Sequence, residues 1–375
     1  MIALYGATGY TGGLVTDELV RAGVDFVLGG RSEEKLGRLS AERGAGAPVA
    51  VAEVDDPASL RALLDGCGAV INCAGPFALM GEPVVEAAIA TGTHYLDSTG
   101  EQEFMRRVFE RQGPAAERAG VALVPAMGFD FVPGDCVARL VAGGMEPLRE
   151  LIVAYDVADW GMSRGTLHTA LEIMNGRGLV YRDGGHHPGP RGVYRRRFDF
   201  GPPAGAPTMA FYPSGEAITV PCHTRTRAVT TLMSARSIAP RAAAPLFPFL
   251  RPGLAAALRT PARRLLDARI RRLPEGPAPD ARRRTAFTVV AEAVAEDGRR
   301  RRGEVTGRDV YGLTAGSLVW AARGMTAGDY DLAGALAPAE AFDPEELLAA
   351  LVDYDVRWRL ETAAAAGQPL AAELN

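Results

Sequence analysis

A glycine-rich turn near the N-terminus carries the clearest binding chemistry in the sequence. It reads Gly6-Ala7-Thr8-Gly9-Tyr10-Thr11-Gly12 and lies between an apolar run and an amphipathic stretch of helical length. Glycine allows a tight turn and a close approach of backbone N–H groups to a ligand, and the start of a helix attracts an anion. In this strand-turn-helix context, the spacing predicts a dinucleotide whose diphosphate contacts all seven residues.

The residues after the second apolar run indicate which dinucleotide is bound. An NAD-preferring domain usually places Asp or Glu there to hold the ribose 2′-hydroxyl, but this sequence has Arg31 and Ser32. A guanidinium at position 31 is suited to clasp a 2′-phosphate, with Ser32 and Lys35 as further donors, so we expect NADP(H). In the alternative interpretation, Arg31 only forms a surface ion pair with Glu33 or Glu34.

Further segments at the ends of predicted strands extend the expected nucleotide site. We expect Asp55 to face the adenine amine, and the segment Cys73-Ala74-Gly75-Pro76-Phe77 to pass beneath the nicotinamide side of the diphosphate. A Gly-Pro pair is typical of a sharp turn that leaves the backbone close to a ligand. Thr99 follows the next strand and is another candidate contact, whereas Phe77 is equally suited to a purely structural role.

Hydride transfer to an acceptor requires few protein groups beyond a proton donor or charge stabiliser opposite the nicotinamide. Asp130 is the first candidate for a substrate-orienting or proton-relaying carboxylate, although it is also well placed to cap a helix that begins near Pro133. Asp97 is a second candidate, with bonding to backbone amides as its alternative. His168 titrates near neutral pH and is the natural proton donor, unless it is a packing residue.

The expected substrate wall comes from both halves of the chain. Ser163 and Thr166 lie at the start of a predicted helix, whose free N–H groups suit an acyl carbonyl or a carboxylate. Phe129 follows the sixth predicted strand at the reactive edge of the sheet. Tyr311 could donate a proton or could belong to the core. No metal site is expected, because the histidines and the four cysteines show no metal-ligand spacing.

These candidates require elements that gather them at one edge of a sheet. From residue 1 to about 130, short β-branched runs alternate with stretches of helical length, as in a parallel α/β sheet. Residues 133–375 show longer alternating segments, and we expect a second α+β domain with a mixed or antiparallel sheet, whose C-terminal end could pack back on the first domain. We predict a Rossmann-type doubly wound domain over residues 1–132, with strands at 2–7, 26–30, 49–54, 69–73, 94–97 and 121–124 and helices at 12–22, 33–42, 57–64, 83–90 and 102–119.

Composition excludes several other functions. The 375 residues carry a formal net charge of −4, which leaves no basic footprint for a nucleic-acid partner. Lys35 is the only lysine, so a Schiff base elsewhere in the chain is excluded. The start lacks the basic region of a signal peptide, and no apolar run reaches the roughly 20 residues of a membrane span, so we expect a cytoplasmic protein.

One segment, residues 241–272, combines apolar residues with several arginines and prolines. This combination is typical of a helical hairpin that packs on its own domain and keeps its arginines in solvent. The alternatives are a lid, a dimer arm or a surface in peripheral contact with a membrane.

The motifs together resemble those of the saccharopine dehydrogenase-like superfamily, especially its branch of trans-acting enoyl reductases, over nearly the whole chain. The resemblance implies an NADP(H)-binding domain followed by an α+β domain that supplies the substrate wall and homodimer contacts. The shared motifs are Gly6-Ala-Thr-Gly-Tyr-Thr-Gly12, Gly30-Arg31-Ser32, Cys73-Ala-Gly-Pro-Phe77, Gly92-Thr-His-Tyr-Leu-Asp97, Thr99-Gly-Glu101, Gly128-Phe-Asp-Phe-Val-Pro-Gly-Asp135, Ser163-Arg-Gly-Thr166 and Asp309-Val-Tyr-Gly-Leu-Thr314.

The resemblance also implies hydride transfer to an unsaturated bond. In the enoyl reductase branch this bond is a C=C conjugated to a thioester, so we expect an NADP-dependent oxidoreductase that acts on an enoyl-type intermediate of secondary metabolism or lipid assembly, with a small molecule or acyl thioester as substrate. In saccharopine-type relatives the bond is an imine, and arginines at positions 164, 177, 195–197 and 225 would then bind two carboxylates. The third alternative is a non-catalytic cofactor-binding or membrane-associated partner protein, which residues 241–272 alone support.

Overall fold

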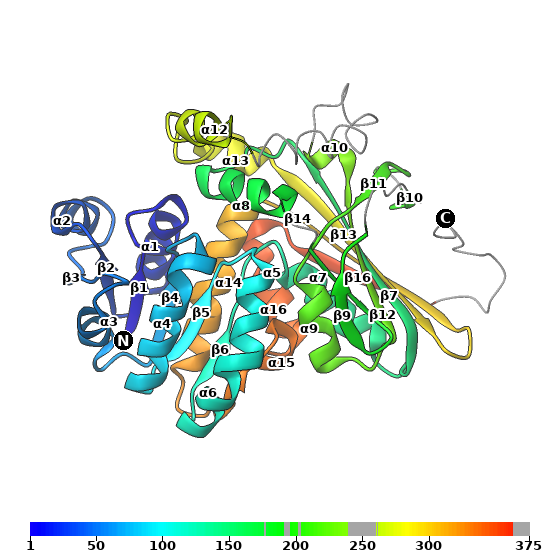
Figure 1. Cartoon of the computed structure of the whole chain (residues 1–375), viewed down its shortest axis with the longest axis horizontal. Helices are drawn as coiled ribbons and strands as arrows, with labels where there is room; N and C mark the ends of the chain where they lie inside the picture. The colour runs from blue at the N-terminus through cyan, green and yellow to red at the C-terminus, as the bar shows by residue number, and fades with distance from the viewer. Residues whose placement is uncertain (176–177, 191–195, 202–203, 239–259, 261, 363–375) are drawn as a thin grey trace.

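The computed structural model describes residues 1–175, 178–190, 196–201, 204–238, 260 and 262–362, and in these ranges the chain forms two β-sheets that lie side by side (Figure 1). The N-terminal sheet and its helices occupy the left of the view, and the second sheet occupies the right. Most of segment 241–272 lies outside the described residues, and its described end contains helix α12 (Ala262–Ile270). Among the described helices, none is long and apolar enough to cross a membrane.

The first sheet is a doubly wound parallel sheet with the strand order β15-β6-β5-β4-β1-β2-β3. Strand β1 pairs with a strand on each side, so Leu4 lies between Leu28 and Ile71. The strand order reverses between β1 and β4, which predicts a ligand crevice at the carboxyl ends of these two strands. The strands are β1 (Ile2–Tyr5), β2 (Phe26–Gly30), β3 (Val49–Val51), β4 (Ala69–Asn72), β5 (His94–Asp97), β6 (Ala122–Val124) and β15 (Gly334–Ala335).

The predicted parallel α/β fold is confirmed, and each of the six predicted strands is present, but the sheet has a seventh strand. Strand β15 pairs with β6 and comes from a distant part of the chain. A strand of only two residues, Gly334 and Ala335, has no periodicity that the sequence could reveal. The first sheet therefore includes residues that lie outside the predicted domain 1–132.

Helices cover both faces of the first sheet. Helices α1, α2 and α14 cover one face, where Val15 and Leu318 share a core with Leu4. Helices α3, α4, α5 and α6 cover the other face, where Leu60 and Val84 are buried. The helices are α1 (Tyr10–Ala22), α2 (Glu33–Glu42), α3 (Pro57–Leu64), α4 (Phe77–Thr91), α5 (Gln102–Arg107), α6 (Gly113–Ala119) and α14 (Val310–Met325).

The single helix predicted over residues 102–119 is interrupted. Helix α5 passes into a π-helical turn, η1 (Val108–Gln112), before α6 begins. Pro114 lies in the first turn of α6, has no N–H to extend the hydrogen-bond ladder and crowds the preceding turn. The wider π turn accommodates the proline, so one predicted helix becomes three consecutive helical segments.

The second sheet is mixed and confirms the expected α+β character of the second half. Its strand order is β10-β11-β12-β7-β13-β14-β16, with β8 and β9 as a hairpin beside β12. Strands β12 and β7 are parallel, whereas β13 is antiparallel to both β7 and β14. The strands are β7 (Leu148–Ala158), β8 (Leu179–Arg182), β9 (Gly185–Pro188), β10 (Arg196–Arg197), β11 (Thr208–Phe211), β12 (Ala228–Ser234), β13 (Ala286–Ala295), β14 (Arg300–Arg308) and β16 (Arg357–Thr362).

Helix α7 (Val132–Ala142) connects the two sheets and begins beside the predicted start at Pro133. Its Val137 and Val141 pack so closely on β14 that a Cβ at position 303 would lie 2.7 Å and 2.8 Å from them, which explains Gly303. One core is therefore continuous from the first sheet to the second. The other helices are α8 (Arg164–Asn175), α9 (Glu216–His223), α10 (Ala235–Ile238), α13 (Pro279–Arg284), α15 (Pro338–Ala341), α16 (Pro344–Ala350) and the short helix η2 (Val352–Tyr354).

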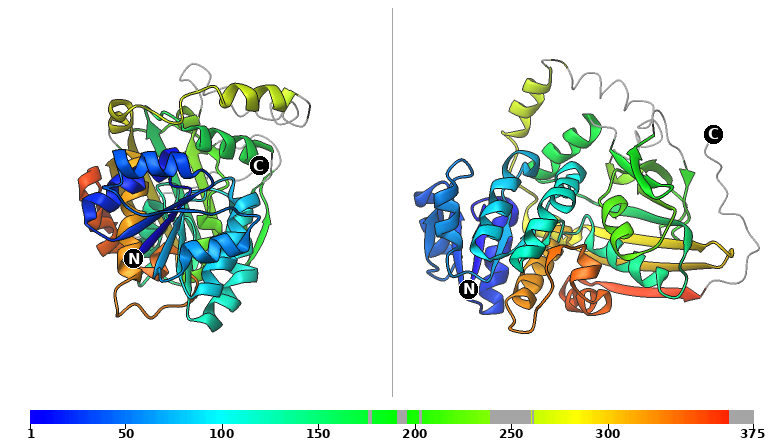
Figure 2. Two further views of the ribbon diagram at one scale, coloured as in Figure 1. Left: turned by 90° about the vertical axis from the view of Figure 1, so that its left-hand side faces the viewer. Right: turned by 60° about the horizontal axis from the view of Figure 1, so that its bottom comes forward.

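Helices α8 and α12 lie near the junction of the two sheets. Figure 2 shows α12 at the outer edge of the molecule, and α12 contacts α8. The described end of segment 241–272 therefore packs on the protein itself. Its position brings α12 next to the carboxyl edge of the first sheet, where a ligand is expected.

Candidate functional site

The glycine-rich turn has the geometry of an anion cradle. Gly6 has a φ of +77°, and a Cβ there would lie 2.7 Å from the backbone nitrogen of Ala74. A Cβ at Gly12 would lie 2.4 Å from the carbonyl oxygen of Gly6. Gly9 precedes α1 and offers no side chain to cap it, so the first N–H groups of this helix are left for an anion. The turn therefore fits the diphosphate that its sequence predicts.

Arg31 lies at the place expected for a reader of the adenosine phosphate. It is exposed directly after β2 and forms no ion pair with any described residue. The alternative of a surface pair with Glu33 or Glu34 is not found, because Glu34 pairs with Arg38 at 2.8 Å. The guanidinium of Arg31 is thus available to a 2′-phosphate.

The neighbours of Arg31 complete this end of the site. The Ser32 side chain caps α2 by accepting a hydrogen bond from the Lys35 backbone N–H at 3.4 Å, and the Lys35 side chain is exposed. Burial raises the pKa of Tyr5, while the charge of Arg31 opposes this rise and that of Asp55 adds to it. Arg31 and Asp55 are therefore both close enough to Tyr5 for their charges to act on its hydroxyl.

The segment after β4 also lies where the cofactor is expected. The Gly75-Pro76 peptide bond is cis, and Cys73, Gly75, Pro76 and Phe77 line a large cavity. The Ala74 N–H instead donates to Asn72 at 2.9 Å and holds the turn in place. The ring of Phe77 also packs on Phe104 at a centroid distance of 5.8 Å, which is the structural role, while its cofactor contact stays a prediction.

Thr99, a predicted cofactor contact, points into the protein, and that contact stays a prediction. Its side chain is buried, and its hydroxyl accepts a hydrogen bond from the Glu101 N–H at 3.1 Å. Glu101 lines the cavity instead, and its carboxylate accepts hydrogen bonds from the N–H groups of Phe77 and Ala78 at 2.9 Å and 2.8 Å. The sequence offered one signal for Glu101, because it belongs to the motif Thr99-Gly-Glu101. Only folding brings its carboxylate to the start of α4.

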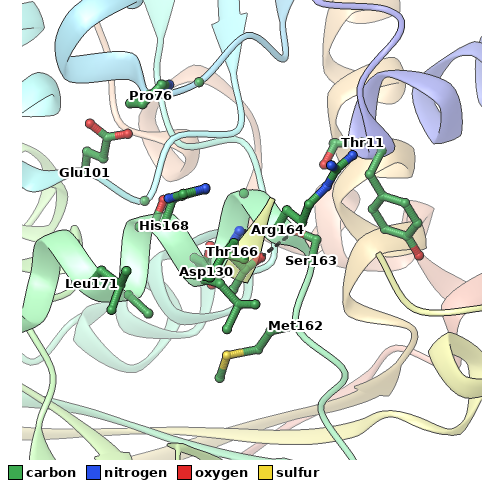
Figure 3. Close-up of a pocket in the computed structure, with 18 of the residues that line it drawn as sticks. Thr11, Pro76, Glu101, Asp130, Met162, Ser163, Arg164, Thr166, His168 and Leu171 are labelled. Atoms are coloured by element: carbon green, nitrogen blue, oxygen red, sulfur yellow. Dashed lines mark hydrogen bonds between the residues drawn. The ribbon is translucent and has the colours of Figure 1, made fainter. Parts of the chain in front are cut away.

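The cavity next to the cofactor turn has a volume of about 890 Å³ (Figure 3). It extends from the carboxyl edge of the first sheet to helices α8 and α12 and to the second sheet. Most of its described wall is apolar, which suits a substrate with a hydrocarbon body. The apolar side chains are Leu79, Trp160, Met162, Leu167, Leu171, Phe211, Met233, Leu266, Ile270 and Leu273.

Asp130 places a carboxylate in this apolar cavity (Figure 3). It makes no hydrogen bond or ion pair with the described residues, and burial raises its pKa to about 6. The alternative of a helix cap is wrong, because Phe131 is the N-cap residue of α7 and no side chain caps that helix. An unpaired acid with a shifted pKa in a cavity is a typical catalytic group, as predicted for Asp130.

Asp97 does not share this position, and its catalytic role stays a prediction. It is fully buried and does not line the cavity. One carboxylate oxygen accepts from the N–H groups of Thr99 and Ala126 at 2.9 Å and 2.8 Å, and the other accepts from the Tyr95 hydroxyl at 2.8 Å. Burial raises the pKa of Asp97 to about 6 despite these bonds. Its alternative role, bonding to backbone amides, is the one that the structure shows.

The start of α8 brings three of the predicted residues to the cavity. His168 lines it, with Nδ1 at 3.5 Å from a carboxylate oxygen of Asp267. Ser163 and Thr166 also line it, and the Ser163 hydroxyl accepts from the Thr166 N–H at 3.1 Å, which caps the helix. Tyr311 is behind this wall, where its hydroxyl accepts from the Ser163 N–H at 2.7 Å. Tyr311 therefore helps to position the wall, and its contact with substrate stays a prediction.

Phe129, which is expected in the substrate wall, is not among the residues that line the cavity. Its ring is buried and packs on Phe287 at a centroid distance of 4.8 Å. Its N–H donates to the hydroxyl of Thr314 at 3.0 Å, which ties the residue to α14. The ring turns inward because the second sheet offers it an apolar surface, and Asp130, the next residue, turns to the cavity.

The arginines expected for a dicarboxylate substrate do not converge on the cavity. Arg164 lines it but forms an ion pair with Glu275 at 2.6 Å. Arg197 and Arg225 are exposed and lie outside the lining, and positions 177 and 195 fall outside the described residues. Within the described ranges, no cluster of His, Cys, Asp and Glu is arranged to hold a metal ion.

Segment 275–277 joins the cofactor turn to the substrate wall. On one side, the hydroxyl of Tyr10 donates to the carbonyl oxygen of Pro277 at 2.8 Å. On the other side, Glu275 pairs with Arg164 at the start of α8. One short segment is therefore held by both halves of the candidate site.

The cavity begins where the nicotinamide end of a bound cofactor is expected and continues along the apolar wall. A hydride donor and an acceptor can therefore meet beside Asp130. These features fit a binding site for NADP(H) with room for a hydride acceptor beside it.

Comparison with known proteins shows what the N-terminal part of the chain resembles. Residues 2–124 match the family model of the saccharopine dehydrogenase NADP binding domain. This match confirms NADP(H) as the cofactor. The fold of the whole chain is that of saccharopine dehydrogenase (L-Glu forming) from Saccharomyces cerevisiae, with a TM-score of 0.61 over 97% of this chain and 99% of that one, at 14% identity.

Two curated relatives carry different names. The chain is 34% identical over 152 residues to a saccharopine dehydrogenase-like oxidoreductase from Bos taurus, and 37% identical over 139 residues to a trans-acting enoyl reductase from Mycobacterium leprae. Each match covers 36% of this chain, and the matches cover 35% and 33% of the two relatives. The chain thus spans about a third of the length of these relatives in the matched regions.

Replacing the exposed guanidinium tests the adenosine end of the site. Arg31→Ala is expected to raise the Kd for NADPH by about 10- to 100-fold, because a charge-assisted contact to the 2′-phosphate is lost. The affinity for NADH, which lacks that phosphate, should stay unchanged, so titrations with both cofactors are the measurement. Arg38→Ala is the matched control, since Arg38 pairs with Glu34 on the exposed face of α2. An equal effect of the two variants would contradict this assignment.

Proposed function

We propose that the protein uses NADPH to reduce a C=C bond that is conjugated to a carbonyl group in an apolar acyl substrate, such as an enoyl thioester. The observation that carries this proposal is the combination of apolar walls with the unpaired Asp130 in one cavity. A hydrocarbon chain gains about 0.8 kcal/mol for each buried CH₂ group, so walls of this kind favour acyl chains. The name of the mycobacterial relative, trans-acting enoyl reductase, supports the same reaction.

The residues of the chain have separate tasks in this reaction. The turn from Gly6 to Gly12 and the guanidinium of Arg31 bind the phosphates of the cofactor, which supplies a hydride when it is bound. The apolar wall orients the acyl chain and excludes water from the reacting bond. Asp130, with its pKa raised to about 6, is the group that delivers a proton to the carbon next to the carbonyl.

The alternative substrate is an imine formed from an α-keto acid and an amino acid. Such a substrate carries two carboxylates, which would need cationic side chains in the cavity. Arg164 pairs with Glu275 and Arg263 pairs with Asp267, whereas Arg269 and Arg271 also line the cavity and remain as possible partners for a carboxylate. Because the chain shares its fold with saccharopine dehydrogenase, the imine reaction is included in the test.

The test compares the two acceptors in one assay of NADPH oxidation. We expect turnover with trans-2-enoyl thioesters, and kcat/KM should increase by about threefold for each added CH₂ until the cavity is filled. Glyoxylate or 2-oxoglutarate together with an amino acid should give no turnover. Turnover with the keto acid and amine alone would contradict the proposal and establish the imine reaction.

A further inference from the structure

Tyr212 is a polar residue of the cavity wall that no sequence motif indicated. It follows β11, precedes Pro213 and lines the cavity that contains Asp130. Its backbone is fixed by β12, because its N–H donates to the carbonyl oxygen of Thr231 at 3.1 Å and its carbonyl oxygen accepts from the Thr231 hydroxyl. The side chain therefore projects from a rigid position in the second sheet.

The hydroxyl of Tyr212 is not used by the protein. Tyrosine hydroxyls in protein interiors usually find a hydrogen-bond partner. The other tyrosines around the site follow this rule: Tyr10 bonds to Pro277, Tyr155 to Glu216 and Tyr311 to Ser163. The Tyr212 hydroxyl makes no hydrogen bond to the part of the chain that the structure describes, so its donor is available to a ligand.

The surroundings keep this hydroxyl protonated. Burial raises the pKa of Tyr212 well above its ordinary value, and the nearby carboxylates of Asp130 and Glu216 raise it further. The ring is held by an edge-to-face contact with Tyr155 at a centroid distance of 6.0 Å. A fixed, neutral phenol is a strong hydrogen-bond donor that costs little reorganisation when an oxygen next to it gains negative charge.

We propose that the Tyr212 hydroxyl donates a hydrogen bond to the carbonyl oxygen of the acyl substrate and stabilises the enolate that forms during reduction. This inference rests on the proposed function and deepens it, since it requires a carbonyl group conjugated to the reduced bond. The hydride adds to the β-carbon, the π electrons of the C=C bond move to the α-carbon and the carbonyl oxygen, and the oxygen becomes negatively charged. Asp130 then protonates the α-carbon, the carbonyl is restored, and the aspartate is left ionised.

Two other hydroxyl groups of the cavity wall differ from Tyr212, because they already bond within the protein. The hydroxyls of Ser163 and Thr166 bond to each other at 3.0 Å, and Thr166 also bonds to Tyr311 at 2.9 Å. These two hydroxyls are therefore shared within the protein before any substrate binds. The Tyr212 hydroxyl has no such competing bond among the described residues.

The test is the variant Tyr212→Phe, assayed with a trans-2-enoyl thioester and NADPH. We expect kcat to fall by about 10²- to 10³-fold, as for the loss of one donor to a developing oxyanion, with a much smaller change in KM. The Kd for NADPH and the Tm should stay close to those of the wild type, because no bond within the protein is lost. A purely structural role would not produce this separation of kcat from KM.

Tyr330→Phe is the matched control, because the hydroxyl of Tyr330 is buried without a hydrogen-bond partner and lies outside the cavity lining. It should retain the wild-type kcat. If the wild type reduces enoyl thioesters and Tyr212→Phe has the same kcat, the role of Tyr212 is overturned and the proposed function stands. Absence of turnover by the wild type with every enoyl thioester would overturn the proposed function, and the inference with it.

Discussion

Asp130→Asn is expected to lower kcat for enoyl reduction by about 10²- to 10⁴-fold, because the amide cannot deliver a proton to the α-carbon. The pH profile gives a second readout. The active form of Asp130 is the protonated one, so wild-type kcat/KM should be constant well below pH 6 and fall as the pH rises through the pKa of about 6. The variant should lose this dependence while its Kd for NADPH stays unchanged.

The free energy of unfolding of Asp130→Asn distinguishes a catalytic role of Asp130 from a structural one. The folded-state pKa of Asp130 is raised from 3.8 to about 6, so folding free energy is lost as the pH rises from 3.8 to about 6, and the whole loss is present above that range. Asp130→Asn removes this loss and should increase the free energy of unfolding at pH 8 by about 3 kcal/mol. Asp25→Asn, at an exposed site away from the cavity, should change neither property. Unaltered kcat in Asp130→Asn would refute the assignment.

Gly12→Ala should abolish NADPH binding in the accessible concentration range and destabilise the protein. The new Cβ would lie 2.4 Å from the carbonyl oxygen of Gly6 and 2.6 Å from that of Ala7, and both atoms belong to the backbone. The turn or the helix must move, so the affinity for NADPH should fall by at least about 100-fold and the free energy of unfolding by about 1–3 kcal/mol. Cofactor titration and thermal unfolding measure the two effects.

Gly37→Ala provides the control for the glycine variant. Gly37 lies within α2, and a Cβ there would meet no atom within 4 Å. Alanine in a helix interior is more favourable than glycine by about 0.5–1 kcal/mol, so this variant should be slightly more stable and bind NADPH normally. Full NADPH affinity in Gly12→Ala would show that the diphosphate does not bind at this turn.

The first sheet could be predicted from the sequence because its signals are local. Short apolar strands, glycine and proline at their ends, and helices of regular period define each unit without reference to distant residues. Strand β15 and helix α14 could not be assigned to this sheet in the same way. Helix α14 is buried nearly all round, so its pattern does not indicate the surface on which it packs.

The site shows the same division between local and distant signals. The glycine-rich turn, Arg31 and Asp130 were predicted because each lies at the end of a strand, where the chain direction fixes its position. Phe129 and Asp130 are neighbours that point to different surroundings, and only the second sheet decides which of them faces the cavity. Glu101 and Tyr212 depend on contacts between distant segments, which no spacing in the sequence expresses.

The attachment of segment 275–277 to both Tyr10 and Arg164 has a thermodynamic consequence. An acyl group that displaced Glu275 would also perturb the contact between Pro277 and Tyr10 of the glycine-rich turn, and the two ligands would then not bind independently. Reciprocity then requires that each ligand changes the affinity for the other by the same factor. In steady-state kinetics, such linkage would be observed as an ordered addition of the two ligands.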